Sequence, residues 1–336
     1  MELDYNQIKS ITNGAIRITQ EEDGFHFFRF TKEQEELYET NRDISLSRNT
    51  YSTSGVQMRF KTDSTKLHLD ISAFKGNNRN YFALDVLVND CRIGSITNYD
   101  ESNLPPVYTV EKFPFGAFSG DFDLGEGIKE VKILFPWSAK AVLQKMILDD
   151  NAMLEGIKPK HKLLCFGDSI TQGYDSLHPS NKHITKLADF LDAEEFNKAI
   201  GGEQFFPELA KTKEPFEPDV ILVAYGSNNW TWSTKEELTE NCNLFYGNLR
   251  ATYPDAKIFA LAPIWRKDSV APSKAGDFAG VAEVIREAVA KDDNITFIQT
   301  YDFVPHEDPF FADLKVHPND NGFEEYYKNL IKIVHL

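Results

Sequence analysis

Cysteine is scarce in this chain, with 3 copies among 336 residues. Cys91, Cys165 and Cys242 each lie in an apolar or periodic stretch, and their spacing fits no metal site. Three cysteines do not make a disulfide framework, so we expect buried free thiols.

Long apolar runs and basic residues are also in short supply. No stretch approaches the roughly 18 apolar residues of a membrane span, and residues 1–5 are acidic where a secretory signal would be apolar. We therefore expect a cytoplasmic, soluble protein, with secretion left open in case a signal peptide precedes this sequence. The 36 Lys and Arg against 52 Asp and Glu give a formal net charge of −16. This balance argues against nucleic acid and membrane as partners.

Several signatures of well-known chemistries are missing. The chain has no G-x-S-x-G elbow, no H-E-x-x-H pair, no Walker loop and no G-x-G-x-x-G. We therefore predict no metal and no nucleotide cofactor.

The pattern of the first 150 residues is that of β-strands. Apolar and polar residues alternate in short segments, separated by Gly, Asn and Asp, at 56–60, 67–71, 82–88, 91–94, 131–135 and 142–148. This pattern predicts a β-sandwich of jelly-roll type over residues 1–150, followed by a linker at 149–161. At this length two domains are favoured over one.

From residue 160 to residue 336 the pattern alternates between strand and helix. Strands are predicted at 162–166, 195–200, 220–225, 258–262 and 295–298, and helices at 184–191, after the Thr234–Glu237 capping box, at 281–288 and at 323–334. Alternating strands and helices imply an α/β fold with a flavodoxin-like parallel sheet, covered on both faces.

The first strand of this second part ends in Gly167-Asp168-Ser169 and passes into a helix. A serine there lies at the carboxyl end of a strand, where open α/β sheets bind ligands. Rigid flanking elements would hold its hydroxyl in place, as a nucleophile requires. The alternative for such a triplet alone is a turn that caps a helix.

Three further segments could complete a site around Ser169. They are the Gly201-Gly202 pair, the stretch from Tyr225 to Trp230 that contains Asn228, and the stretch from Asp313 to Asp320 that contains His317. The order Ser, Gly, Asn, His resembles the SGNH hydrolases, also called the GDSL esterase/lipase family. The four blocks span roughly residues 163–336, and their order is more specific than any single block.

The resemblance implies that Ser169 is the nucleophile, His317 its base and Asp313 the acid that orients the histidine. A histidine suits proton transfer in both directions near neutral pH. The family commonly has two residues between the acid and the histidine, whereas this chain has three, with Leu314 at the expected position of the acid. Either the loop bulges so that Asp313 reaches the ring, or a backbone carbonyl holds His317 in a Ser–His dyad.

The same resemblance implies an oxyanion site made by the backbone N–H groups of Ser169 and Gly202 and by the Asn228 side chain. Gly201-Gly202 allows two alignments, and Gly202 fits better because an acidic residue follows it. The family usually has Asp directly after this Asn, whereas here Asn229 follows Asn228. We interpret this difference as a change in loop bonding rather than in catalysis.

Aromatic residues close to the predicted strand ends are candidates for substrate contacts. Tyr225, Trp230, Trp232 and Trp265 could wall an acyl pocket or stack on a sugar, and core packing is the equal alternative.

We expect a serine esterase acting on short acyl esters, with acetylated sugars as the favoured substrates. One alternative is a lipase or thioesterase for longer acyl chains. Another is a glycan-binding protein with a vestigial site, in which the sandwich serves as a lectin-like module. The expected partner is a small-molecule or carbohydrate ester, and the oligomeric state is left open.

Overall fold

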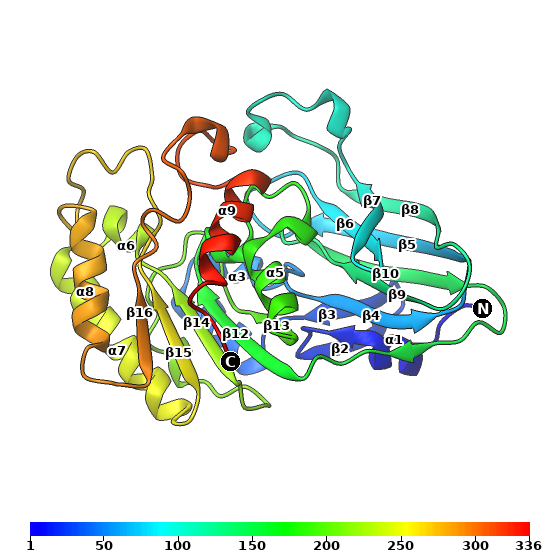
Figure 1. Ribbon diagram of the computed structural model, residues 1–336, viewed down its shortest axis with the longest axis horizontal. Coiled ribbons are helices and arrows are strands. Elements are labelled where there is room, and N and C mark those ends of the chain that lie inside the picture. Colours follow the sequence, from blue (N-terminus) through cyan, green and yellow to red (C-terminus); the bar gives the residue numbers. More distant parts are fainter.

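The computed structural model describes residues 1–336, with the antiparallel sheets and the parallel sheet side by side (Figure 1). The first part contains α1 (Tyr5–Ile11), β1 (Thr12–Asn13), β2 (Arg17–Glu21), β3 (Gly24–Phe28), α2 (Lys32–Asn41), α3 (Ile44–Asn49), β4 (Gln57–Thr62), β5 (Lys66–Lys75), β6 (Ala83–Val88), β7 (Cys91–Thr97), the short 3₁₀ helices η1 (Glu101–Asn103) and η2 (Tyr108–Val110), β8 (Gly116–Asp123), β9 (Lys129–Leu134), β10 (Ala139–Leu148) and β11 (Glu155–Gly156). None of the helices of the whole chain is long and apolar enough to cross a membrane.

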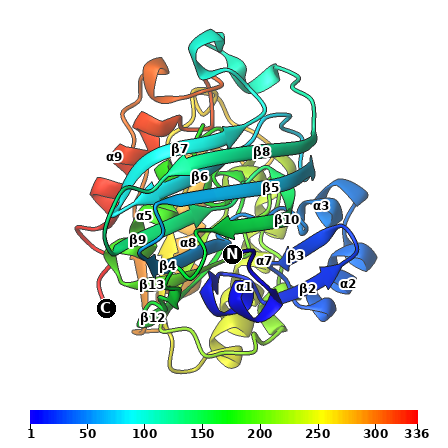
Figure 2. The ribbon, with the colours of Figure 1, turned by 90° about the vertical axis from the view of Figure 1, so that its right-hand side faces the viewer.

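Two antiparallel sheets form the sandwich, which Figure 2 views face-on. One sheet has the order β1-β4-β9-β6-β7, with β11 beside β4, and the other has the order β2-β3-β10-β5-β8. Alternate residues of both sheets, such as Phe60 of β4 and Leu69 of β5, meet in one buried core. The strands predicted from alternation are therefore present, whereas the jelly-roll connectivity stays a prediction.

The first 150 residues also contain helices, where we had predicted only strands. α2 begins at a capping box formed by Thr31 and Gln34, and α3 begins after Asp43, whose side chain caps it. Phe30 and Tyr38, beside and on α2, are buried in the core of the parallel-sheet part. This segment of the sandwich thus packs against the second half of the chain.

The predicted linker is part of the folded structure as well. β11 pairs with β4, and the next strand, β12 (His161–Gly167), begins at the last residue of the predicted linker. At the junction of the two parts, the buried guanidinium of Arg29 donates hydrogen bonds to the carbonyl oxygens of Asn197 and Ala199. The two parts therefore contact each other through buried polar groups, and the division into two domains stays a prediction.

The second part is a five-stranded parallel sheet with the order β13-β12-β14-β15-β16. Its elements are β12 (His161–Gly167), α4 (Ser169–Gln172), η3 (Pro179–Asn181), α5 (His183–Phe190), β13 (Ala193–Asn197), η4 (Leu209–Lys211), β14 (Val220–Ala224), α6 (Ser227–Trp232), α7 (Lys235–Thr252), β15 (Lys257–Leu261), α8 (Ala279–Val289), β16 (Ile295–Ile298), η5 (Asp308–Phe310) and α9 (Asp320–Leu330). The predicted strands and helices are present, with their ends within four residues of the predicted positions. The strand predicted at 195–200 ends at Asn197, and the last helix begins at Asp320.

The central strand β12 shows why the sheet is covered on both faces. Leu164 and Phe166 point into one hydrophobic core, and Leu163 and Cys165 point into another. Burial on both faces explains the continuous apolar run in the sequence. Cys242 is buried too, whereas Cys91 is exposed, contrary to the expectation for all three thiols.

Candidate active site

Ser169 is the first residue of α4, directly after β12. The Asp168 side chain caps this helix by accepting a hydrogen bond from the N–H of Ile170 at 3.0 Å. Gly167 is required here, because a Cβ atom at that position would lie 2.4 Å from Oγ1 of Thr171. The strand end and the capped helix thus hold Ser169 at the carboxyl edge of the sheet.

Asp168 is fully buried beside Ser169. Burial raises the pKa of this carboxyl to about 6, although the hydrogen bond from Ile170 and the charge of His317 oppose the rise.

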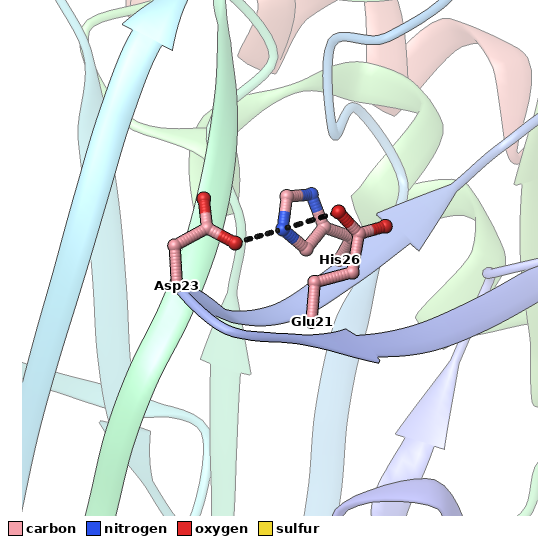
Figure 3. Close-up of side chains that lie close together, drawn as sticks. All are labelled: Glu21, Asp23 and His26. Atoms are coloured by element: carbon pink, nitrogen blue, oxygen red, sulfur yellow. Dashed lines mark hydrogen bonds and ion pairs between the residues drawn. The ribbon is translucent and has the colours of Figure 1, made fainter.

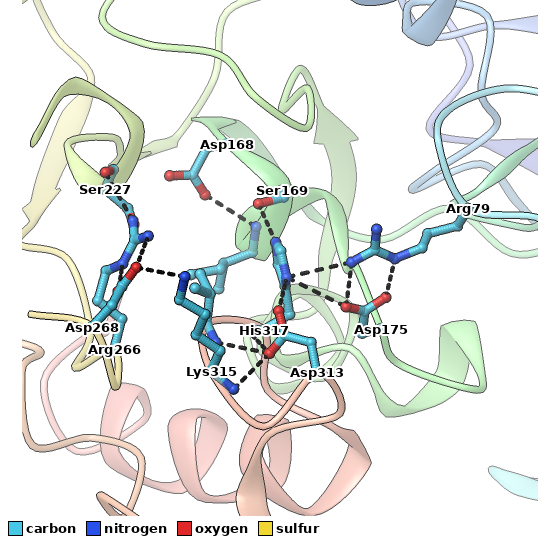
Figure 4. A network of polar contacts seen from close by, with 12 residues as sticks. Arg79, Asp168, Ser169, Asp175, Ser227, Arg266, Asp268, Asp313, Lys315 and His317 are labelled. Carbon is cyan, nitrogen blue, oxygen red and sulfur yellow. Dashed lines mark hydrogen bonds and ion pairs between the residues drawn. The ribbon is translucent and has the colours of Figure 1, made fainter. Parts of the chain in front are cut away.

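His317 reaches Ser169 from a loop just before α9 (Figure 4). Its Nε2 lies 2.9 Å from Oγ of Ser169. The loop is fixed by a hydrogen bond from the N–H of Ala312 to the carbonyl of His317, and the Asn319 side chain caps α9. The serine and histidine of the sequence pattern are therefore within hydrogen-bond reach of each other.

Asp313 contacts the opposite ring nitrogen of His317, with Oδ2 2.8 Å from Nδ1. Its Oδ1 accepts hydrogen bonds from the N–H groups of Lys315, Val316 and His317. Burial raises the pKa of the Asp313 carboxyl, but the hydrogen bond and charge of His317 and the backbone donors outweigh this and lower it below the usual range. The ionised carboxylate accepts a hydrogen bond from Nδ1–H, which leaves the lone pair of Nε2 free to accept the Ser169 hydroxyl proton.

The extra residue of the loop is absorbed at Leu314, whose φ is +56°. This left-handed conformation is uncommon for a residue with a branched side chain. It produces the bulge that lets Asp313 reach the ring, so the structure favours the bulged loop over the carbonyl-held dyad.

The candidate oxyanion donors lie around the same cavity as Ser169. The N–H of Gly201 is bonded to Oε1 of Gln172 at 2.7 Å, whereas the N–H groups of Gly202 and Ser169 have no acceptor within the protein. Nδ2 of Asn228 donates one hydrogen bond, to the carbonyl of Glu203 at 2.9 Å. Of the two alignments of the glycine pair, the free N–H favours Gly202.

Asn229, which stands where the family usually has Asp, is fully buried. Its side chain accepts from the N–H of Phe205 and donates to Gln204 and Ser233. It links two loops and does not line the cavity, in line with the expected role in loop bonding.

A cavity of about 610 Å³ opens beside Ser169. Both parts of the chain line it, and only 4 of its 21 lining residues are hydrophobic. The lining residues are Asp43, Ser45, Leu46, Arg48, Asn49, Lys75, Asn77, Asn78, Arg79, Ser169, Tyr174, Gly201, Gly202, Gln204, Ser227, Asn228, Thr231, Trp232, Arg266, Val316 and His317. The site is thus wide and polar, and the sandwich builds one wall of it.

Of the four aromatic residues that we considered for substrate contacts, the structure places three outside the cavity. Tyr225 packs in the core against Phe205, and Trp230 packs against Phe278; neither lines the cavity. Trp232 does line it and is 51% exposed. Trp265 stacks on His306 outside the cavity.

Sequence reasoning missed Asp175 and Arg79, which also meet His317 (Figure 4). Arg79 lies in the sandwich and Asp175 a few residues after the nucleophile, and neither belongs to a motif that we could recognise. Sequence reasoning also missed Arg266, which binds Ser227 and Asp268 on the other side of Ser169.

Two groups of side chains bring carboxylates and a histidine together in the way that metal sites do. In one of them, Asp175 and Asp313 surround Nδ1 of His317, an atom already used in the hydrogen bond to Asp313. The absence of a resident metal stays a prediction.

The other group lies at the β2–β3 hairpin (Figure 3). Nε2 of His26 contacts Asp23 at 2.7 Å and Glu21 at 3.7 Å, and both carboxylates are about half exposed. These contacts account for the grouping without a metal.

Residues 165–324 match the model of the GDSL-like Lipase/Acylhydrolase family. This part of the chain, with its serine at the carboxyl edge of a parallel sheet, belongs to that family, as the resemblance to the SGNH hydrolases implied. The protein is therefore a carboxylic ester hydrolase. The comparison with curated proteins finds no match.

Solved structures share the fold over 83% to 96% of this chain. A salicylyl-acyltransferase, SsfX3, from a tetracycline biosynthetic pathway has a TM-score of 0.76 at 17% identity, covering 96% of this chain and 95% of that one. A family two carbohydrate esterase from Clostridium thermocellum in complex with cellohexaose has a TM-score of 0.62 at 14% identity, covering 84% of this chain and 92% of that one. An acetyl xylan esterase, Est2A, from Butyrivibrio proteoclasticus has a TM-score of 0.57 at 16% identity, covering 83% of this chain and 88% of that one.

Proposed function

We propose that the protein is a serine esterase that removes short acyl groups, acetyl foremost, from carbohydrate esters. The observation that carries the proposal is the wide polar cavity beside the Ser169–His317 pair. A sugar presents many hydroxyl groups, and side chains such as Asn77, Gln204 and Asn228 offer it donors and acceptors.

In the proposed mechanism His317 takes the proton of Ser169 as the hydroxyl oxygen attacks the ester carbonyl. Asp313 holds the ring in the required tautomer and stabilises the imidazolium that forms. The N–H groups of Ser169 and Gly202 and the Asn228 amide stabilise the oxyanion. His317 then protonates the leaving sugar hydroxyl, and water hydrolyses the acyl-enzyme with His317 as base.

The lining of the cavity disfavours longer acyl chains. Its hydrophobic residues are Leu46, Tyr174, Trp232 and Val316, which provide little apolar surface for a fatty acyl group. Burial of each methylene stabilises a complex by about 0.8 kcal/mol only where apolar surface receives it. A lipase or thioesterase would need a longer apolar channel.

The continuous hydrogen-bond chain from Asp313 through His317 to Ser169 supports catalysis over a vestigial site. A binding protein that has lost its activity would be under no constraint to keep all three groups aligned within hydrogen-bond reach.

The experiment is a comparison of kcat/KM for p-nitrophenyl acetate, butanoate and octanoate, together with acetate release from acetylated xylo-oligosaccharides. We expect the acetate ester to be the best of the three and the acetylated sugars to be deacetylated, with Ser169→Ala as the inactive control. A preference for octanoate would favour the lipase, and sugar binding without turnover would favour the binding protein. Adding free alcohols as acceptors would reveal acyl transfer, the activity in the name of one structural neighbour.

A further inference from the structure

We propose that Asp175 and Arg79 are positioning residues that form a second, charge-balanced support for His317. The proposal builds on the serine esterase function proposed above. In this proposal the sandwich contributes a residue that positions the catalytic histidine, because Arg79 lies in the loop after β5.

The support approaches His317 from the side of Nδ1 (Figure 4). Oδ2 of Asp175 lies 3.3 Å from Nδ1, slightly farther than Oδ2 of Asp313 at 2.8 Å. Nη2 of Arg79 lies 3.5 Å from the same nitrogen. Arg79 also holds Asp175 with two hydrogen bonds, from Nε at 2.6 Å and from Nη2 at 2.7 Å.

The Asp175 side chain is fully buried, and its surroundings compensate the carboxylate. The hydroxyl of Tyr81 donates to Oδ1 at 2.5 Å, and that of Tyr108 donates to the backbone carbonyl of Asp175. A buried charge is costly unless it is paired and hydrogen-bonded, and this one is both. All three partners, Arg79, Tyr81 and Tyr108, come from the sandwich.

The backbone of Asp175 has φ of +71°. This conformation is costly for a residue with a side chain and is found where the surroundings enforce it. Burial lowers the pKa of Arg79, but the hydrogen bonds and charge of Asp175 outweigh this and raise it. The pair is therefore built into the fold and does not depend on a mobile surface side chain.

The two charges act on the histidine ring in opposite directions. The Asp175 carboxylate favours the imidazolium form of His317, and the Arg79 guanidinium disfavours it. Together they contact the ring from the side of Nδ1 and hold it against rotation. The titratable groups that face the ring are Asp313 on its own loop, Tyr174 and Asp175 after α4, Asp168 before it and Arg79 from the sandwich.

The test is the pH profile of kcat/KM for p-nitrophenyl acetate in single and double variants. Asp175→Asn leaves the Arg79 cation beside the ring, so its acid-side midpoint moves to lower pH by roughly one unit. Arg79→Gln leaves the carboxylate unbalanced, so the midpoint moves to higher pH. The midpoint of the double variant lies close to that of wild type. Arg79→Lys keeps the positive charge, so its midpoint lies between those of wild type and Arg79→Gln.

The Arg250–Asp292 ion pair supplies a matched control, since it joins the end of α7 to the segment before β16, away from the strand ends that carry Ser169. Asp292→Asn should leave the pH midpoint at the wild-type value. Ring titration of His317 by NMR in isotope-labelled protein gives the same shifts without turnover. The proposal would be overturned if neither variant shifts the midpoint, or if Asp175→Asn and Arg79→Gln shift it in the same direction. If the wild type is inactive but the two variants shift the titration of the His317 ring in opposite directions, only the esterase function would be overturned.

The wall of the cavity that the sandwich builds carries positive charge. Arg48 and Lys75, both exposed and both from the sandwich, line the cavity without an ion pair to any carboxylate. The only carboxylate in the lining is Asp43, which is engaged as the cap of α3. Arg48 and Lys75 therefore place positive charge on this wall of the cavity, in a chain whose net charge is −16.

From this wall we infer that the ester substrate carries an anionic group, such as a carboxylate; the inference rests on the proposed function. The test compares kcat/KM for acetylated glucose, for acetylated glucuronate and for a hemisuccinate ester of glucose. The last two place the anion on the alcohol and on the acyl side. We expect one anionic ester to exceed the neutral one by about tenfold, as two exposed ion pairs allow.

The preference should fall in Arg48→Gln/Lys75→Gln and at high salt. Lys9→Gln/Lys291→Gln is the control, because it removes the same charge at exposed positions outside the cavity. If neutral and anionic esters are hydrolysed equally well, or if the control variant lowers the preference as much, the inference is wrong while the esterase function stands. If no ester is hydrolysed, both are wrong.

Discussion

Asp313 and His317 are joined by a 2.8 Å hydrogen bond between Oδ2 and Nδ1, although three residues lie between them. The other oxygen of Asp313 accepts hydrogen bonds from the backbone N–H groups of Lys315, Val316 and His317, so one carboxylate both closes the loop and orients the histidine. A single residue in a left-handed conformation, Leu314, makes this closure possible.

The first prediction concerns this bond. Asp313→Asn should lower kcat on a short ester by roughly 10⁴-fold, because an amide at this position holds the ring in the wrong tautomer. Steady-state kinetics decides the matter, with circular dichroism to check the fold. A variant that keeps more than about a tenth of wild-type kcat would assign Asp313 to loop structure alone.

Asn228→Ala should lower kcat far more than it raises KM. The Asn228 amide uses one hydrogen bond on the carbonyl of Glu203 and has a second hydrogen free for the oxyanion. Loss of one oxyanion donor costs roughly 2.7–4 kcal/mol, or 10²–10³ in kcat. If KM changes and kcat does not, Asn228 positions the substrate instead.

Asp168→Asn should stabilise the protein at pH 8 but not at pH 4. The pKa of Asp168 is about 6 in the folded protein, raised by burial, so the unfolded chain releases this proton at lower pH than the folded one. The folded state therefore loses stability as pH rises from about 4 to 6, by about 3 kcal/mol in all. Asparagine keeps the helix cap without the charge.

Urea unfolding of wild type and Asp168→Asn at the two pH values measures this effect. The gain of the variant over wild type should be larger at pH 8 by about 3 kcal/mol. An equal difference at both pH values would mean that Asp168 ionises in the folded protein as easily as in the unfolded chain.

His183 should make the fold sensitive to acid. Its ring stacks on Phe323 and on Tyr326, neither ring nitrogen has a partner, and burial lowers its pKa to about 3. Below pH 6.5 the unfolded chain binds a proton that the folded protein does not, so stability falls as pH decreases toward 3.

The variant His183→Phe keeps the stacking and removes the titration. Between pH 7.5 and pH 4.5, wild type should lose about 3 kcal/mol more of its unfolding free energy than the variant does. Parallel losses in the two proteins would show that His183 takes up its proton without unfolding.

The parallel-sheet part was largely predictable from the sequence. Strands buried on both faces, such as β14, appear as continuous apolar runs, and the Thr234–Glu237 capping box marks the start of α7. The pairing of Ser169 with His317 followed from the order of the family blocks. The capping box of Thr31 and Gln34 also indicates the start of α2, but the alternating pattern of the surrounding strands led us to predict strands only.

The remaining parts of the site depend on tertiary structure that no local pattern encodes. Arg79 and Asp175 are brought together only when the sandwich packs on the sheet, and neither follows a recognisable motif. For Tyr225, proximity to a strand end did not reveal the direction of the side chain, which points into the core.

The most direct test of the account is the fate of Ser169 during turnover. Wild type and Ser169→Ala would be mixed with p-nitrophenyl acetate, quenched in acid, digested and analysed by mass spectrometry. We predict a burst of p-nitrophenol and an acetylated Ser169 peptide in wild type, and neither in the variant, whose kcat should be lower by on the order of 10⁶. Acetyl groups on other residues only, or turnover by a correctly folded Ser169→Ala at a rate close to wild type, would contradict it.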